Sequence, residues 1–363
     1  MHSGAAGPSR YDKRDIAHMN FYPHQYIDRE TGSILTENLC ADGLIAWMYG
    51  GVRENAPRLF SALVSPRFSK MLAWLHYDLH RHLCQQQIRY IFQTLNIDSG
   101  EIADDVSHYR CLRDIFERKI KYDACRPMPP AENTPGVVTS PADARMLFGS
   151  FSDTSRFFIK EKFFDYAELI GIDKPRWLHQ FRGGDMAVFR LTPDKYHYNH
   201  VPVSGTIADS YEIAGLYHSC NPGAVVHMAT PLSKNRRMVT IIDTDIAGGA
   251  GIGYVAMIEI VALMIGDIVP CYSNNAYDHP QKPHVGMYVR QGQPQSLYRP
   301  GSSTTVLIFE NNRIQFSEDI RRNMLRQDVS SRYSRGFGMP LVETDVRVRS
   351  EIARRISTMF RSV

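Results

Sequence analysis

The 363-residue sequence lacks the cysteine spacing of a zinc site or of a disulfide-stapled fold. Its six cysteines include no Cys-x-x-Cys pair, and such scattered cysteines are typical of reduced thiols in a cytosolic protein. It also lacks a strong charge imbalance, because 42 Lys and Arg residues stand against 38 Asp and Glu residues, a net charge of +4. This balance gives no reason to expect a nucleic-acid partner.

Long apolar runs are missing as well. The longest, Val255–Ile265, contains Glu259 and is too short to cross a bilayer, so it predicts a buried strand. The first residues, Met1–Arg14, are polar and have no apolar core of a secretory signal. We therefore expect a cytoplasmic protein without a transmembrane helix, while contact with a membrane surface stays open.

Two common enzyme motifs are absent. Gly248–Gly253 does not have the G-x-G-x-x-G spacing of a dinucleotide loop and lacks the Lys-Ser/Thr of a P-loop, so it predicts a glycine-rich turn before a strand. No G-x-S-x-G elbow surrounds Ser302, which argues against an ordinary serine hydrolase.

The first 135 residues have a helical pattern. Apolar side chains recur at intervals of three and four residues between Leu44 and Leu75. Pro57 marks the start of a helix, and Pro66 separates two helices. Basic residues edge the same stretch. The segment is either a helical subdomain packed on the core or an amphipathic surface that lies on lipid headgroups.

From residue 136 to 316 the pattern changes to short apolar runs separated by Gly, Pro and Asn, which indicates a β-rich domain. The predicted strands include Met186–Leu191, Val225–Met228, Met238–Ile242, Tyr254–Ile265 and Thr304–Phe309. The expected fold class is α+β, an N-terminal helical segment followed by a β-rich catalytic domain of mostly antiparallel strands.

Residues 317–363 form an arginine-rich C-terminal tail. The stretch Val342–Phe360 predicts a helix of mixed charge. The tail is either a solvated appendage or a contact for anionic lipid or a partner.

Three places carry residues suited to chemistry: Asp143, the pair His197 and His200, and the serine that follows Gly301. An aspartate can hold a histidine in the right tautomer, and that histidine can deprotonate a serine. Two histidines three residues apart also suit a metal, but no Asp, Glu or Cys cluster completes a site at recognisable spacing, so no metal is expected.

At these residues the sequence resembles the phosphatidylserine decarboxylase family. That family has a P-A-D-G motif, a Y-H-x-x-H-x-P motif and a terminal G-S-S or L-G-S-T motif in this order. Here they read Pro141–Ala144, Tyr196–Pro202 and Gly301–Thr304, with Ala144 in place of the glycine. Further matching segments are Phe116–Lys119, Arg126–Pro127, Lys234–Arg237 and Val285–Gly292, and the resemblance covers residues 109 to 310.

The resemblance implies a proenzyme that cuts itself between Gly301 and Ser302. Asp143 would orient His200, and His200 would deprotonate Ser302, whose attack on the preceding carbonyl leads to a covalent pyruvoyl cofactor. This pyruvoyl group would form a Schiff base with phosphatidylserine and release CO2 to give phosphatidylethanolamine. His197 would place a proton on the carbanion or steer the carboxylate.

Several alternatives stay open. Alignment from Phe309 makes Ser303 the nucleophile instead of Ser302. The substrate is phosphatidylserine in a membrane surface or a soluble, for example aromatic, amino acid, and a non-cleaving homologue would be an inactive binding module. The resemblance further implies large and small chains that stay associated and a peripheral position on the membrane. Association of two copies as a homodimer is undecided.

Overall fold

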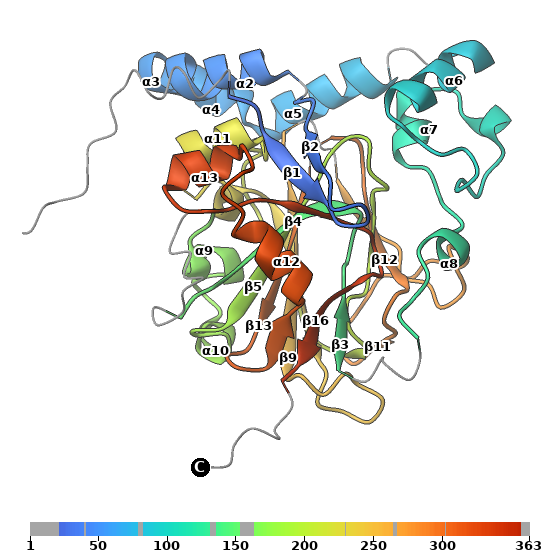
Figure 1. Ribbon diagram of the computed structural model, residues 1–363, viewed down its shortest axis with the longest axis vertical. Coiled ribbons are helices and arrows are strands. Elements are labelled where there is room, and N and C mark those ends of the chain that lie inside the picture. Colours follow the sequence, from blue (N-terminus) through green and yellow to red (C-terminus); the bar gives the residue numbers. More distant parts are fainter. Residues whose placement is uncertain are drawn as a thin grey trace, which may run out of the picture.

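The computed structural model describes residues 22–39, 41–78, 83–130, 136–152, 163–228, 230–263, 267–301 and 303–356. A row of helices lies along one end of the molecule, and β-sheets fill the body beneath it (Figure 1). The predicted α+β class with mostly antiparallel strands is confirmed. Among the described residues, none of the helices is long and apolar enough to cross a bilayer.

A ten-stranded sheet forms the centre of the body. In spatial order its strands are β11 (Tyr288–Val289), β7 (Gly205–Ile213), β8 (Arg237–Asp243), β9 (Tyr254–Val261), β13 (Ser303–Phe309), β5 (Asp185–Leu191), β4 (Ala144–Ser150), β15 (Thr344–Val346), β1 (Gln25–Asp28) and β2 (Ile34–Thr36). Neighbouring strands are antiparallel except β1 and β15. Every residue of β13 is buried, as expected for an apolar strand covered on both faces. The strand that follows the predicted cleavage site is thus central.

Two three-stranded sheets complete the body. The first has the order β10 (Ile268–Pro270), β12 (Pro294–Tyr298) and β6 (Tyr198–His200), and the second has β14 (Ile314–Phe316), β16 (Glu351–Arg355) and β3 (Val137–Thr139). Four residues, 299–302, separate the end of β12 from the start of β13. A short connection between two sheets therefore contains the predicted cut.

The helical end comprises α2 (Asp42–Trp47), η1 (Met48–Val52), α3 (Arg53–Asn55), α4 (Pro57–Leu63), α5 (Pro66–Ala73) and the π-helical turn η2 (Trp74–Asp78). We call these elements the roof helices (Figure 1). Beside them lie α6 (Gln85–Thr94), η3 (Val106–His108), α7 (Leu112–Phe116) and α8 (Tyr122–Cys125). The predicted helix start at Pro57 and the predicted separation of two helices at Pro66 are confirmed, since a proline in the first turn loses no intrahelical bond.

Four of the five predicted strands are confirmed, with small differences at their ends, but Val225–Met228 is wrong. This stretch lies in α11 (Pro222–His227). The Asn221 side chain accepts a 2.8 Å hydrogen bond from the Gly223 amide, and Pro222 occupies the first helical position. An Asn-Pro pair is a helix start signal that outweighs a short β-branched run. The other helices of this part are α9 (Tyr166–Ile170), α10 (Pro175–Gln180) and η5 (Leu232–Lys234).

The C-terminal segment contains α12 (Glu318–Met324), α13 (Arg332–Phe337), β15 and β16. The predicted helix over Val342–Phe360 is wrong for the described residues up to 356. Val342, Val346 and Val348 are buried and Arg347 is exposed, and valines at even spacing favour a strand over a helix. The division of the chain at residues 135 and 316 stays a prediction, with β1, β2 and β15 all joining the large sheet.

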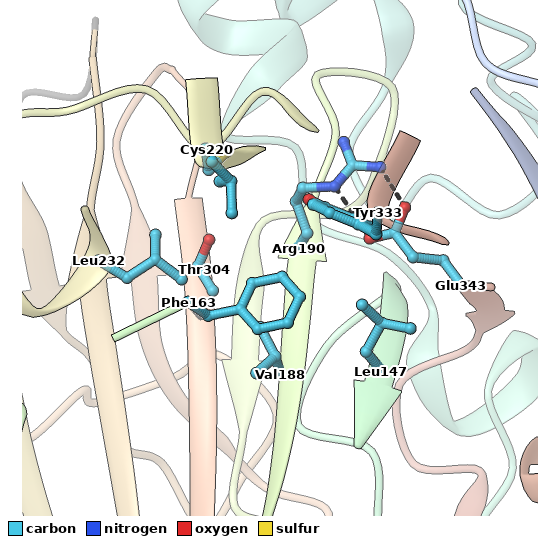
Figure 2. A pocket seen from close by; sticks show the side chains of 10 residues that line it. Leu147, Phe163, Val188, Arg190, Cys220, Leu232, Thr304, Tyr333 and Glu343 are labelled. Carbon is cyan, nitrogen blue, oxygen red and sulfur yellow. Dashed lines mark hydrogen bonds and ion pairs between the residues drawn. The ribbon is translucent and has the colours of Figure 1, made fainter. Parts of the chain in front are cut away.

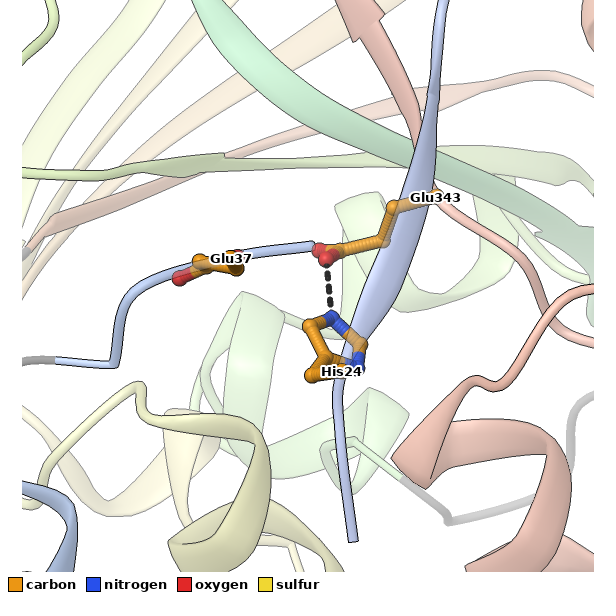
Figure 3. A group of neighbouring side chains, drawn as sticks. All are labelled: His24, Glu37 and Glu343. Atoms are coloured by element: carbon orange, nitrogen blue, oxygen red, sulfur yellow. Dashed lines mark hydrogen bonds and ion pairs between the residues drawn. The ribbon is translucent and has the colours of Figure 1, made fainter. Parts of the chain in front are cut away.

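A buried charge cluster joins distant parts of the chain (Figure 3). Arg190 on β5 donates to Glu37 at 2.6 Å and to Glu343 at 2.6 Å, and His24 lies 2.7 Å from the same Glu343 carboxylate. Burial acts to raise the pKa of Glu343, but Arg190 and His24 outweigh it and lower the pKa. The two carboxylates and the imidazole bring ligand atoms within 4.8 Å of one another, and the Arg190 guanidinium supplies the positive charge between the carboxylates.

The packing of β16 predicts a large loss of stability when its core side chain is shortened. Ile352 on β16 is fully buried, whereas Ile356 is 41% exposed. Ile352→Ala should lower the free energy of unfolding by about 2–5 kcal/mol. The matched change Ile356→Ala should lower it by less than about 1 kcal/mol. Urea unfolding of both variants measures the difference, and equal small losses would show that the segment is an appendage.

Candidate functional site

The two histidines of the predicted site lie beside the segment that leads to Gly301. Strand β6 pairs antiparallel with β12, with His200 opposite Pro294. The Tyr298 amide then donates a 3.0 Å hydrogen bond to the His197 carbonyl. The structure therefore brings the Tyr196–Pro202 motif to the end of β12, three residues before Gly301.

The two motif positions where the family has glycine differ in conformation. Gly301 has a φ of 140°, in the region that side chains with a Cβ rarely enter. Ala144 is the first residue of β4 and is not among the described residues with positive φ. Glycine is therefore needed at 301, and alanine is tolerated at 144.

Ser302 lies outside the described residues. Ser303 begins β13, where it pairs with Val261 on one side and Leu191 on the other. Its buried hydroxyl has no hydrogen-bond partner among the described residues, and its carbonyl faces the Cys220 thiol at 3.9 Å. The backbone of Ser303 is thus already held in the sheet.

His200 is a buried, uncharged imidazole with both nitrogens engaged. Its Nδ1 lies 2.8 Å from the Gly292 carbonyl, which only accepts, so we assign the proton to Nδ1. Nε2 then accepts from the Tyr196 hydroxyl at 3.0 Å, and Tyr196 lies 2.7 Å from the Tyr277 hydroxyl. Burial lowers the pKa of His200 to about 4. Near neutral pH its Nε2 therefore carries a lone pair, which the Tyr196 hydroxyl must release before the ring can take a proton.

The backbone next to Asp143 contacts His200, but the Asp143 carboxylate forms its hydrogen bonds with other residues. The His200 amide donates to the Pro141 carbonyl at 2.7 Å, so the two motifs touch. The Asp143 carboxylate, however, accepts from Arg126 at 2.9 Å and from the Val348 amide at 2.7 Å. Burial acts to raise the pKa of Asp143, and Arg126 brings it below its usual range. No hydrogen bond joins Asp143 to the His200 ring among the described residues, and the Gly292 carbonyl sets the tautomer instead.

His197 is fully buried and is held by stacking. Its ring lies on Phe116, with 3.6 Å between centroids and 29° between planes. Neither ring nitrogen has a well-aligned hydrogen-bond partner among the described residues. Burial first, and then the positive charge of Arg118, lower the pKa of His197 to about 3. A buried imidazole without a well-aligned partner calls for an explanation, and a catalytic role is one such explanation.

A buried polar network binds both sides of the predicted cut. Asn199 donates to Glu259 at 3.1 Å and accepts from Thr305 on β13 at 2.8 Å. Tyr298 on β12 donates to the Thr304 carbonyl at 3.0 Å. Burial raises the pKa of Glu259 to about 7. The sequence showed Glu259 as a lone charge within an apolar run but did not indicate its partners.

A small cavity lies on the other face of β13 (Figure 2). Its volume is about 10 Å³, and Thr304, Cys220, Arg190, Tyr333 and Glu343 are among its lining residues. Such a space holds at most about one water molecule. It therefore does not admit a phospholipid headgroup.

The buried neutral histidines predict a loss of stability in acid. Burial lowers the pKa of His197 to about 3 and those of His200 and His218 to about 4. Unfolded histidine titrates near 6.5. Stability from these rings is therefore present above pH 6.5 and lost as pH falls toward 4, by up to about 4 kcal/mol per pH unit.

The variant His218→Gln should reduce the slope of unfolding free energy against pH by about 1.4 kcal/mol per pH unit, because one fewer proton is taken up on unfolding. His284→Gln, at an exposed histidine, is the control and should leave the slope unchanged. Urea titrations between pH 4.5 and 7 measure both, and a His218→Gln slope equal to the parent's would refute neutral burial of that ring.

Comparison with known proteins agrees with this geometry. A family model for phosphatidylserine decarboxylase matches residues 112–331. A phosphatidylserine decarboxylase proenzyme of Fusobacterium nucleatum subsp. nucleatum is 28% identical over 312 residues, 84% of this chain and 93% of the relative. Proteins of the same name from Chlamydia trachomatis serovar L2b and Clostridium perfringens (strain ATCC 13124) are 30% and 29% identical; each alignment covers 81% of this chain and 90% or 91% of the relative. The predicted family is confirmed: the chain belongs to the phosphatidylserine decarboxylase family of carboxy-lyases.

Proposed function

We propose that the chain is a self-cleaving proenzyme that decarboxylates phosphatidylserine at a membrane surface. The observation that carries the proposal is the pairing of β6 with β12. It binds the His197 carbonyl to the Tyr298 amide, three residues before Gly301, and places His200 opposite Pro294 at the start of β12. Two buried neutral imidazoles are thus held on the strand that leads to the glycine–serine bond.

His200 is the proposed base for cleavage. Its neutral ring takes the Ser302 hydroxyl proton as the oxygen attacks the Gly301 carbonyl carbon, so an ester forms and the Ser302 amine is released. Elimination then frees the Gly301 carboxylate, and water replaces the amine, which leaves as ammonia. Asp143, buried with Arg126, contributes its negative charge, which raises the pKa of His200.

The residues present fit the pyruvoyl group that the family implies. The Ser303 hydroxyl at the start of β13 has no hydrogen-bond partner among the described residues, and the ring nitrogens of His197, whose carbonyl is bound to Tyr298, have no well-aligned one. A pyruvoyl group would supply a carbonyl that captures the substrate amine and accepts the electron pair left when CO2 departs. His197 would hold or deliver a proton there, and Asn199 and Tyr298 would keep β12 and β13 in place across the cut.

Cleavage of two serine variants identifies the nucleophile. We favour Ser302 because a glycine before it leaves the attacked Gly301 carbonyl uncrowded. Ser302→Ala should therefore abolish cleavage, and Ser303→Ala should retain it. A denaturing gel with intact mass detects the small chain that begins at 302. Retained cleavage in Ser302→Ala would make Ser303 the nucleophile, and a parent chain that never cleaves would leave the inactive-homologue alternative.

The same gel tests the other two assigned groups. Asp143→Asn and His200→Ala should slow cleavage by about 100-fold or more, the range of general-base catalysis. Asp143→Asn also leaves Arg126 without its buried partner, so its unfolding free energy must be measured alongside. Normal cleavage in both variants, with both folded, removes them from the mechanism.

The roof helices are the proposed lipid-facing surface. Their exposed large apolar side chains are Leu44, Trp47, Leu59, Met71, Trp74 and Leu75, and their exposed basic ones include Arg58, Arg67 and Lys70. Within residues 42–78, Glu54 is the one exposed carboxylate. Apolar side chains mixed with positive charge suit an anionic membrane surface. This placement would make the protein peripheral on the membrane.

Vesicle binding tests the surface. The double variant Trp74→Ser, Leu75→Ser should weaken sedimentation with phosphatidylserine vesicles by about tenfold, because burying a large apolar side chain is worth about 1.5–3 kcal/mol. Self-cleavage should be unchanged. Ile172→Ser removes an apolar side chain that is 77% exposed and lies between α9 and α10, away from the roof. This control should bind normally, and normal binding by the double variant would refute the surface.

Substrate class is settled by comparing headgroups. The parent protein should release CO2 from phosphatidylserine in vesicles and far less from free amino acids. Equal turnover of a soluble aromatic amino acid would favour the soluble-substrate alternative.

A further inference from the structure

The ring of His197 takes its orientation from one aromatic contact. Its two nitrogens lack well-aligned partners among the described residues, and the Lys195 backbone near the ring acts only to raise its pKa. Phe116 covers one face at a centroid distance of 3.6 Å. A stacked pair adds about 0.5–1.5 kcal/mol to simple burial, and here it is the contact that resists rotation.

Phe116 ends α7, and the residues after it also act on His197. Arg118 is buried, and its guanidinium donates to the Ile115 and Asp194 carbonyls at 3.2 and 2.6 Å. Its charge lowers the pKa of His197 further. The C-terminal end of α7 therefore sets both the position and the charge state of this imidazole.

The roof holds α7 through η2. Tyr77 meets Phe116 edge to face at a centroid distance of 5.6 Å. Asp78 accepts two hydrogen bonds of 2.6 Å from Arg113, the bidentate geometry that is strongest for this pair. Two independent contacts thus fix α7 to one five-residue helical turn.

Two other residues of η2, both apolar, are exposed to solvent. Trp74 is 49% exposed and Leu75 is 41% exposed, while Tyr77 is buried. One side of η2 therefore belongs to the proposed lipid-facing surface, and the other side contacts α7, whose Phe116 covers His197.

We propose that Phe116 is the positioning residue for His197, and that η2 holds Phe116 in place from the lipid-facing surface. The inference rests on the proposed role of His197 in decarboxylation. It adds a physical link between the membrane-contacting turn and the imidazole. His200 takes no part in this link, because its ring is held by Gly292 and Tyr196.

The first test separates decarboxylation from cleavage. Phe116→Leu and Phe116→Met keep an apolar side chain but remove the flat face. Both should cleave at the parent rate, and both should lose about 10-fold to 100-fold in kcat on phosphatidylserine vesicles, with KM within about twofold, because misplacement of a reacting group by about 1 Å costs this much. Phe116→Tyr keeps the ring and should restore kcat.

A matched control accounts for loss of packing alone. Phe92 on α6 is buried and meets Tyr109 edge to face. Phe92→Leu should lower stability to a similar extent and leave kcat unchanged. Equal losses of kcat in Phe92→Leu and Phe116→Leu would overturn the proposal, as would parent-like kcat in Phe116→Met.

A second readout does not depend on turnover. In Phe116→Leu, water should reach the His197 ring, and its pKa should rise from about 3 toward the ordinary value of 6.5. The nearby Asp143 and Asp194 favour the same direction and Arg118 opposes it. Titration by NMR of the imidazole, with His197→Gln to assign the signal, measures this shift. An unchanged pKa would overturn the proposal.

The link to the roof has its own variant. Asp78→Asn weakens the contact with Arg113 and should lower kcat by a factor of about 3 to 10 without affecting cleavage, since only one of the two contacts with α7 is lost. Parent-like kcat in Asp78→Asn would limit the role to Phe116. A parent protein that fails to cleave would instead refute the proposed function itself, so the two failures are distinguishable.

Discussion

The backbone pairing of β6 with β12 is the constraint on which the site depends. It holds His200 opposite Pro294, at the start of β12, and the His197 carbonyl on the Tyr298 amide, at the end of β12 that leads to Gly301. Because these strands are buried, both imidazoles are uncharged near neutral pH. One desolvated pair of strands thus provides both position and protonation state, and two different environments separate the roles of the rings.

The surroundings of the two rings suit the two different reactions proposed for them. His200 has a carbonyl and a hydroxyl on its nitrogens, a closed hydrogen-bonded arrangement suited to a base that is used once. His197 has an aromatic face and open nitrogens, suited to a partner that comes and goes. His197 directly precedes β6 and stacks on Phe116, whereas His200 ends β6 beside Tyr196 and Gly292, so each ring meets different parts of the protein.

The sequence was sufficient for the fold class, four of five strands, the helix start at Pro57, the separation of two helices at Pro66, and the family. These features depend on local pattern and short motifs. It was insufficient for Val225–Met228, which is helical because Asn221 and Pro222 start a helix there. It was also insufficient for the C-terminal segment, where the evenly spaced valines, and not the many arginines, determine the secondary structure. It also did not reveal that Arg126 and Val348 hold Asp143 or that Gly292 binds His200. Those contacts join residues far apart in the chain, and no local pattern encodes them.

The position of β13 has a consequence for the reactive group. If the proposed cut falls before Ser302, the new chain end precedes a strand that has neighbours on both sides along its whole length. A strand held in this way would not swing as a long flexible arm does. The substrate would then travel the whole distance to the carbonyl, and a lipid would have to be lifted partway from the bilayer while β13 stays in place.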